Sequence, residues 1–155
     1  MRTPGINRDD GFRYLPSKDT PSSSTGNNFN IVNIAPPKGG WKSIQIKQDG
    51  NVITVLVTGG NKVELKDSKR ELVESEVNYL VENLNSPVVL KFEMSNLVYL
   101  SSKAWEMLVH ATENTANKDS RFELVNITHE MYEPLVLQET QYLLNKLNIV
   151  NPPAL

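Results

Sequence analysis

One run of seven residues, VITVLVT at 52–58, constrains the fold more than any other part of the chain. It is rich in β-branched residues and apolar on both faces, which is typical of a central strand that is covered on both sides. A second β-rich run at 43–47 precedes it, and the segment 48–51 between them contains the Asp-Gly pair that favours a hairpin turn. The sequence therefore predicts two antiparallel strands, with helices over one face of the second.

A helix and another strand are predicted next. Gly59 and Gly60 interrupt the strand, and Ser68 with Glu71 three residues later has the form of a capping box. An apolar stripe of helical spacing follows, made of Leu72, Val73, Val77, Leu80, Val81 and Leu84. The carboxylates of this helix are interpreted as a solvated face with local ion pairs, namely Glu71, Glu74, Glu76 and Glu82. After Pro87, the apolar run 88–92 is predicted to be a buried strand.

The remaining residues predict helix, strand and helix. Ser101 or Ser102 can cap a second helix that ends near Asn117. Its inward face is expected to contain Ala104, Trp105, Leu108 and Ala111. A strand at 121–127 follows, then a third helix capped by Thr128, which must accommodate Pro134 by a kink or a late start. The closing apolar residues are expected to finish the core: Leu135, Val136, Leu143, Leu144, Leu147 and Ile149.

The predicted architecture is one α/β domain over residues 41–155. A mixed sheet of about four strands, with about three helices packed mainly on one face, is the simplest arrangement of these elements. Residues 1–40 contain five prolines and the polar tract 22–28, a composition typical of a flexible tail. Within that tail, the concentrated apolar residues could dock as a short extended piece: Phe29, Ile31, Val32 and Ile34.

Composition excludes several classes of function. The net charge of −2 and the dispersed basic residues argue against nucleic acid as a partner. The absence of cysteine excludes disulfides, thiolate zinc sites and a cysteine nucleophile. No run approaches the roughly 20 apolar residues of a membrane span, and the first residues lack the apolar core of a signal peptide. We therefore expect a cytoplasmic protein that is not inserted in a membrane.

Catalytic and ligand-binding motifs are sparse. His110 and His129 have no metal-ligand spacing, so we expect no metal and no cofactor. The glycine-rich segment 58–62 could cradle a phosphate, although a plain turn explains it without a ligand. An enzyme with Ser101 or Ser102 as nucleophile is another possibility, but no general base accompanies either serine. We therefore expect a protein that is not an enzyme.

The element order over 87–150 resembles the core of a STAS domain, the fold of anti-sigma factor antagonists and of the cytoplasmic tails of sulfate transporters. The resemblance consists of an apolar strand (VVLKFEM), two serines opening a helix (YLSSKAWEML), a strand ending in Asn (FELVNI), and a helix that continues into a leucine-rich tail. The upstream hairpin and helix fit the same plan, so the resemblance covers about 115 residues.

In that family the second helix commonly opens with Asp-Ser-Ser-Gly, and a partner kinase phosphorylates the first serine. Ser101 matches this phosphoacceptor, whereas Leu100 and Lys103 stand in place of the Asp and the Gly. The resemblance implies a signalling protein of transcription regulation that docks onto a kinase-like anti-sigma factor through Tyr99, Leu100, Ser101, Ser102 and Lys103. The alternative is a constitutive STAS scaffold or assembly subunit of a stress-signalling or transport complex, in which Ser101 is only a helix cap. The oligomeric state stays open.

Overall fold

A computed structural model describes residues 34–137 and 139–154. Its elements, in chain order, are β1 (Ile44–Asp49), β2 (Val52–Val57), β3 (Val63–Leu65), α1 (Asp67–Glu82), β4 (Val89–Glu93), β5 (Leu97–Leu100), α2 (Ser102–Ala116), β6 (Arg121–Val125), α3 (His129–Leu137) and the 3-10 helix η1 (Glu139–Lys146). The predicted α/β class is confirmed, and β3, β5 and η1 are additions that the sequence analysis did not contain.

The main sheet has four strands in the order β1-β2-β4-β6. β1 and β2 are antiparallel, whereas β2, β4 and β6 are parallel to one another, so the predicted mixed sheet is confirmed. Asp49 lies opposite Val52, which leaves Gly50 and Asn51 as a two-residue turn. Gly50 has a φ of 63° and Asn51 does not have a positive φ, as in a type II′ hairpin turn with glycine first.

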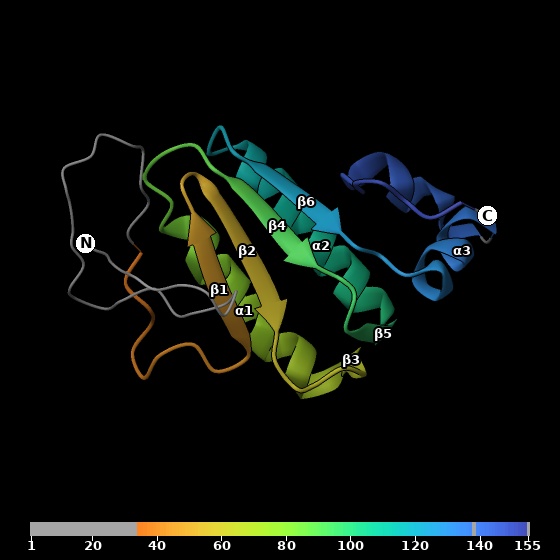
Figure 1. Cartoon of the computed structure of the whole chain (residues 1–155), viewed down its shortest axis with the longest axis horizontal. Coiled ribbons are helices and arrows are strands. Elements are labelled where there is room, and N and C mark those ends of the chain that lie inside the picture. The colour runs from red at the N-terminus through yellow and green to blue at the C-terminus, as the bar shows by residue number, and fades with distance from the viewer. Residues whose placement is uncertain (1–33, 138, 155) are drawn as a thin grey trace.

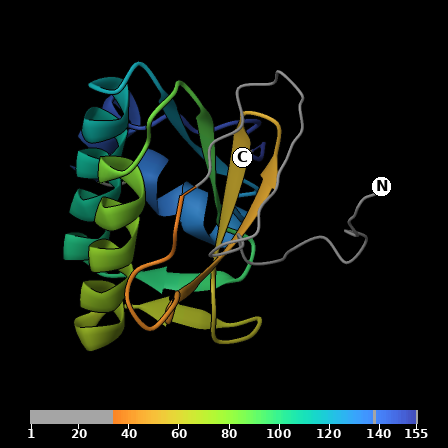
Figure 2. The same cartoon turned by 90° about the vertical axis from the view of Figure 1, so that its left-hand side faces the viewer.

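Helices α1 and α2 lie on the same face of this sheet (Figures 1 and 2). The crossovers β2-α1-β4 and β4-α2-β6 step across the sheet in the same direction, and crossovers of one handedness then place both helices on one side. Ile53, Val55 and Val57 are buried beneath them. The opposite face of β2 is only half-buried, so the prediction that this strand is covered on both sides is half right.

Helix α1 follows the predicted stripe with one exception, and it begins differently from the prediction. Its buried residues include Val73, Val77, Leu80 and Val81, but Leu72 is exposed. The predicted capping box does not form, because the N-cap is Lys66 and Ser68 lies inside the helix; Lys66 makes no side-chain capping bond. The backbone instead turns sharply from β3 into the helix, with a φ of −155° at Lys66 and 53° at Asp67.

Glu76 corrects the interpretation of the α1 carboxylates. It is 5% exposed, not solvated. Its Oε1 accepts hydrogen bonds from the backbone N–H and the hydroxyl of Ser43, both at 2.8 Å, and its Oε2 accepts from the Lys42 N–H at 2.8 Å. A buried carboxylate needs such donors, and these donors attach the entry of β1 to the middle of α1.

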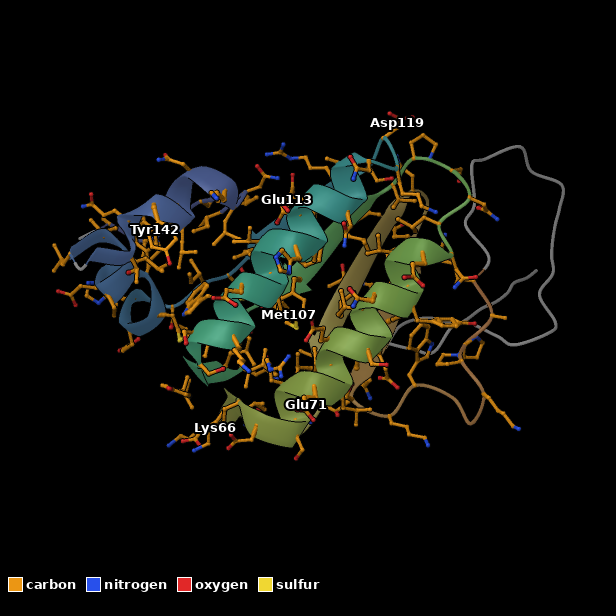
Figure 3. All side chains as sticks on the ribbon, turned by 180° about the vertical axis from the view of Figure 1, so that it is seen from behind. Lys66, Glu71, Met107, Glu113, Asp119 and Tyr142 are labelled. Carbon is orange, nitrogen blue, oxygen red and sulfur yellow. The ribbon has the colours of Figure 1, made fainter. Side chains whose placement is uncertain are left out.

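Helix α2 closely matches its prediction. Ala104, Leu108 and Ala111 are buried, and the half-buried Trp105 packs against the core. The helix ends at Ala116, one residue before the predicted end. Additional residues contribute to the buried side, including Met107, which lies between α1 and α2 (Figure 3). At the far ends of the two helices, the Lys118 ammonium donates to the Glu82 carbonyl at 2.9 Å.

The C-terminal part completes the sheet edge. Strand β6 is two residues shorter than predicted, and the Thr128 hydroxyl accepts from the Met131 N–H at 3.3 Å, as expected of the α3 cap. Pro134 lies inside α3, so a late start of that helix is wrong. Of the predicted closing residues, Leu135, Leu143 and Leu147 are buried and the others are half-buried. Ile149 forms a parallel bridge with Leu124 of β6.

The packed domain begins earlier than residue 41. Ile34 is 3% exposed, and the Tyr79 hydroxyl donates to the Ala35 carbonyl at 3.0 Å. Trp41 meets Tyr79 edge-on, with ring centroids 5.7 Å apart. Figure 2 shows this segment running along the side of the molecule where α1 and β1 lie. The predicted docking of Phe29, Ile31 and Val32 lies outside the described residues, as does the rest of 1–33.

Candidate docking site

The starts of the helices gather at one end of the sheet. Because β2, β4 and β6 are parallel, their carboxyl ends lie at the same end of the sheet. Side chains for binding commonly collect at this end in α/β proteins. The short parallel strands β3 and β5 pair there, near the first turns of α1 and α2 (Figures 1 and 2). Strand β5 leads directly into α2, so this small sheet positions the predicted site.

Ser101 is the N-cap of α2. Its hydroxyl accepts a hydrogen bond from the Ala104 N–H at 3.2 Å, and its own N–H donates to the Leu65 carbonyl of β3 at 3.1 Å. Its φ of −68° and ψ of 166° are the extended geometry of an N-cap. Ser101 is half-buried, whereas Ser102, the first helical residue, is exposed. The structure thus assigns the cap to the first of the two serines.

The apolar part of the site differs from the prediction. Leu100 is 6% exposed and belongs to the core, so it is not available to a partner. Tyr99 is 48% exposed, and so is Val98, which was not among the residues predicted to bind a partner. Two adjacent exposed residues break the usual alternation of a strand, and the pairing of β5 with β3 shifts register between Val63 and Glu64.

Charged side chains surround the start of α2. Lys103 is exposed at the second position of the helix, and Lys66 follows the strand β3 that pairs with β5. The Lys66 ammonium lies 3.4 Å from the Glu64 carboxylate. Tyr99, Ser102 and Lys103 are exposed and Ser101 is half-buried, so all four reach the surface where β5 passes into α2. Apolar side chains beside hydroxyl and ammonium groups can supply contact area and directed hydrogen bonds to a protein partner.

Asn96 holds this end of the molecule together. It is 8% exposed, and its Nδ2 donates to the Val57 carbonyl at 2.7 Å and to the Gly60 carbonyl at 3.2 Å. The backbone carbonyl of Asn96 accepts a hydrogen bond from the Val63 N–H at 2.8 Å, so this one residue joins the end of β2 to β3 and β5. Sequence reasoning missed Asn96, because a single Asn between two apolar runs is also what an ordinary loop contains.

The glycine-rich segment 58–62 forms a turn. Gly59 and Gly60 have φ values of 122° and 98°, which residues with a Cβ rarely adopt. The Thr58 carbonyl accepts a hydrogen bond from the Lys69 ammonium at 2.7 Å. The backbone conformation is therefore a sufficient reason for both glycines, and it favours the plain turn over a phosphate cradle.

The histidines lie apart from one another at the surface. His110 is exposed on α2, and His129 is the exposed first residue of α3, with its Nδ1 3.8 Å from the Glu133 Oε1. Residues 34–137 and 139–154 contain no group of three or more His, Asp or Glu side chains that could hold a metal ion. The two histidines are thus surface residues, and His129 also lies at the start of a helix.

Within the described part of the chain, no helix has the length and apolar character needed to cross a membrane.

Neither a scan against models of known protein families nor a search of curated proteins found a match for this chain.

Proposed function

We propose that the chain is a regulatory protein-binding module that resembles an anti-sigma factor antagonist. In this proposal it docks onto a kinase-like anti-sigma factor in the cytoplasm through the surface of Val98, Tyr99, Ser101, Ser102 and Lys103. The observation that carries the proposal is the place of Ser101, which caps α2 one buried residue after the exposed pair Val98 and Tyr99 of β5. The mixed sheet with α1 and α2 on one face is compatible with the STAS plan.

Binding without catalysis is part of the proposal. The Ser101 hydroxyl accepts the Ala104 N–H, which is a capping arrangement. A nucleophilic serine instead donates its proton to a base, and no described residue accepts a hydrogen bond from this hydroxyl. The exposed residues of the surface suit contact with another protein, because tyrosine is among the residues that most often carry the binding energy of an interface.

Phosphorylation of Ser101 would act as the switch. A phosphate adds about −1.5 to −2 charges at pH 7, and the positive end of α2 tolerates that charge in the free protein. At an interface the same charge must lose its water, which is costly unless the partner supplies a matching cation. We therefore propose that the unmodified chain binds and the modified chain is released.

The experiment begins with capture of the partner from the native cell and its identification by mass spectrometry. Calorimetric titration against that purified partner then compares the wild type with Ser101→Asp, Ser101→Ala and Lys103→Glu. Aspartate is a good N-cap, so Ser101→Asp changes the charge of the surface while it preserves the helix start. We expect Ser101→Asp to weaken binding by about tenfold or more, and Ser101→Ala to bind almost like the wild type.

Unfolding curves of the same variants separate loss of binding from loss of folding. Glu113→Lys on the outer face of α2 is a suitable control, because Glu113 is exposed near the opposite end of the helix (Figure 3). Equal affinities of wild type, Ser101→Asp and Lys103→Glu for the partner would move the interface elsewhere and refute the switch.

A second candidate is a constitutive scaffold or assembly subunit. It is favoured by Leu100, which fills the position of the family's Asp with a core side chain, and by Lys103 in place of Gly. Under this alternative, the captured partners are other STAS proteins or transporter subunits, and Ser101→Asp does not change their affinity. Recovery of a histidine-kinase-like ATPase whose binding is sensitive to Ser101→Asp would support the antagonist instead.

A further inference from the structure

The two edges of the main sheet differ in how they are closed. At the β6 edge, the Leu124 N–H donates to the Asn148 carbonyl at 2.8 Å, and the Val150 N–H donates to the Leu124 carbonyl at 3.0 Å. At the other edge, β1 pairs with β2 alone, and no described residue forms a backbone hydrogen bond with its outer side. Among residues 34–137 and 139–154, strand β1 therefore presents an open edge.

The hydrogen-bond pattern identifies the open groups. The Thr58 N–H donates to the carbonyl of Ser43, and these two residues lie directly opposite in the register that continues from Ile44 and Val57. Opposite pairs alternate between bonded and non-bonded along an antiparallel ladder. Consequently Gln45, Lys47 and Asp49 bond to β2, whereas Ile44, Ile46 and Gln48 direct their N–H and C=O groups outward.

This edge carries more exposed cations than anions. Lys42 and Lys47 are exposed, Lys38 lies in the turn before them, and none of the three lies within ion-pair distance of a described carboxylate. Two acids are near. The carboxylate of Glu76 is buried on the N–H groups of Lys42 and Ser43, and Asp49 is exposed at the hairpin end. Glu76 is therefore not available to pair with the lysine ammonium groups.

We propose that the open edge of β1 binds an extended acidic segment of a protein partner, which adds to the sheet as a strand next to β1. In strand addition, backbone hydrogen bonds supply affinity and side chains supply selectivity. Lysines on an edge disfavour pairing with neutral or basic strands, and they attract an acidic one. The charge of the edge is thus the feature that selects the partner.

Charge also argues against the other two occupants. When Ile46 of one copy lies opposite Gln48 of a second copy, antiparallel pairing through β1 puts the two Lys47 side chains directly opposite each other, and like charges in that position are destabilising. Residues 20–33 of this chain contain no charged side chain, and residues 1–19 contain four Lys or Arg against three Asp, so this segment is not acidic. Neither occupant matches the edge as an acidic strand does.

The experiment measures amide exchange of the full chain by NMR with two probe peptides. One is a capped heptapeptide of alternating glutamate and valine, and the other has lysine in place of each glutamate. At millimolar concentration, we expect the acidic peptide to slow exchange of the outward amides of Ile44, Ile46 and Gln48 by about threefold or more. The amides of Gln45 and Lys47, already bonded to β2, should not change, and the lysine peptide should have no effect.

A charge-reversal pair sharpens the test. Lys47→Glu should weaken binding of the acidic peptide by about threefold to tenfold, whereas Lys146→Glu on η1, which is equally exposed but distant in the fold, should not. Equal protection by both peptides, or by neither, would overturn the proposal. So would outward amides that are already protected without peptide, because another part of the chain or a second copy then occupies the edge.

Discussion

Helices α1 and α2 pack side by side on one face of the same sheet, yet they begin in different ways. Helix α2 starts from a side-chain cap, the hydroxyl of Ser101 on the Ala104 N–H. Helix α1 has no such cap; the Lys66 carbonyl accepts the Arg70 N–H at 3.1 Å after a sharp backbone turn at Asp67. Its additional polar anchor is Glu76, in the middle of the helix.

The difference shows that a helix can be fixed in a fold by its first turn or by its interior. In α2 a local capping bond and an apolar stripe agree, so local sequence is sufficient to locate the start. In α1 the start follows β3, which ends one residue before Lys66, and a long-range hydrogen bond between Ser43 and Glu76 fixes the middle of the helix. Substitutions at matched positions of the two helices can test this contrast.

The largest effect is expected in the buried stripe of α2. Leu108 is 0% exposed, so Leu108→Ala should lower the free energy of unfolding by about 2 to 5 kcal/mol through lost burial and the cavity that remains. Leu72→Ala, on the exposed side of α1, is the matched control and should change it by less than about 0.5 kcal/mol. Urea unfolding of both variants measures the difference, and similar losses would contradict the described packing.

An intermediate effect is expected from the interior anchor of α1. Glu76→Ala leaves two N–H groups and one hydroxyl without their acceptor, and should cost about 2 to 4 kcal/mol. Glu71→Ala on the exposed side of the same helix should cost less than about 0.5 kcal/mol. If thermal unfolding finds the two substitutions equivalent, Glu76 does not attach β1 to α1 as described.

The smallest effect compares the two helix starts directly. Ser101→Ala removes the α2 cap and should cost about 1 kcal/mol, because the Ala104 N–H loses its acceptor. Ser68→Ala should be nearly neutral or slightly stabilising, since Ser68 lies inside α1 and is exposed. Denaturant midpoints of the two variants measure these losses of stability. A larger loss for Ser68→Ala than for Ser101→Ala would indicate that Ser68 does cap α1.

Local patterns were sufficient to predict most of the main sheet and its two covering helices. The alternating strands, the stripe of α1 and the inward face of α2 are each encoded within a few residues. The short strands β3 and β5 were missed, because three or four residues are too few for a periodic signal and their pairing joins segments more than thirty residues apart. Glu76 was misplaced for a related reason, since its donors come from another element.

At the candidate site, the sequence located the N-terminal part of α2 but not its surroundings. Ser101, Ser102 and Lys103 lie where their positions at a helix start imply. The burial of Leu100 and the exposure of Val98 depend on how β5 pairs with β3. A pattern of apolar residues cannot reveal which of several neighbours faces the core when the strand itself is irregular.

The closure of the β6 edge by residues 148–150 also bears on the order in which the chain is made. Those residues leave the ribosome after every strand of the main sheet, so the outer backbone groups of Leu124 stay unpaired until residue 150 has emerged. An unpaired strand edge is where newly made chains associate wrongly with one another. The last residues of the sheet thus set how long the nascent protein needs protection from its neighbours.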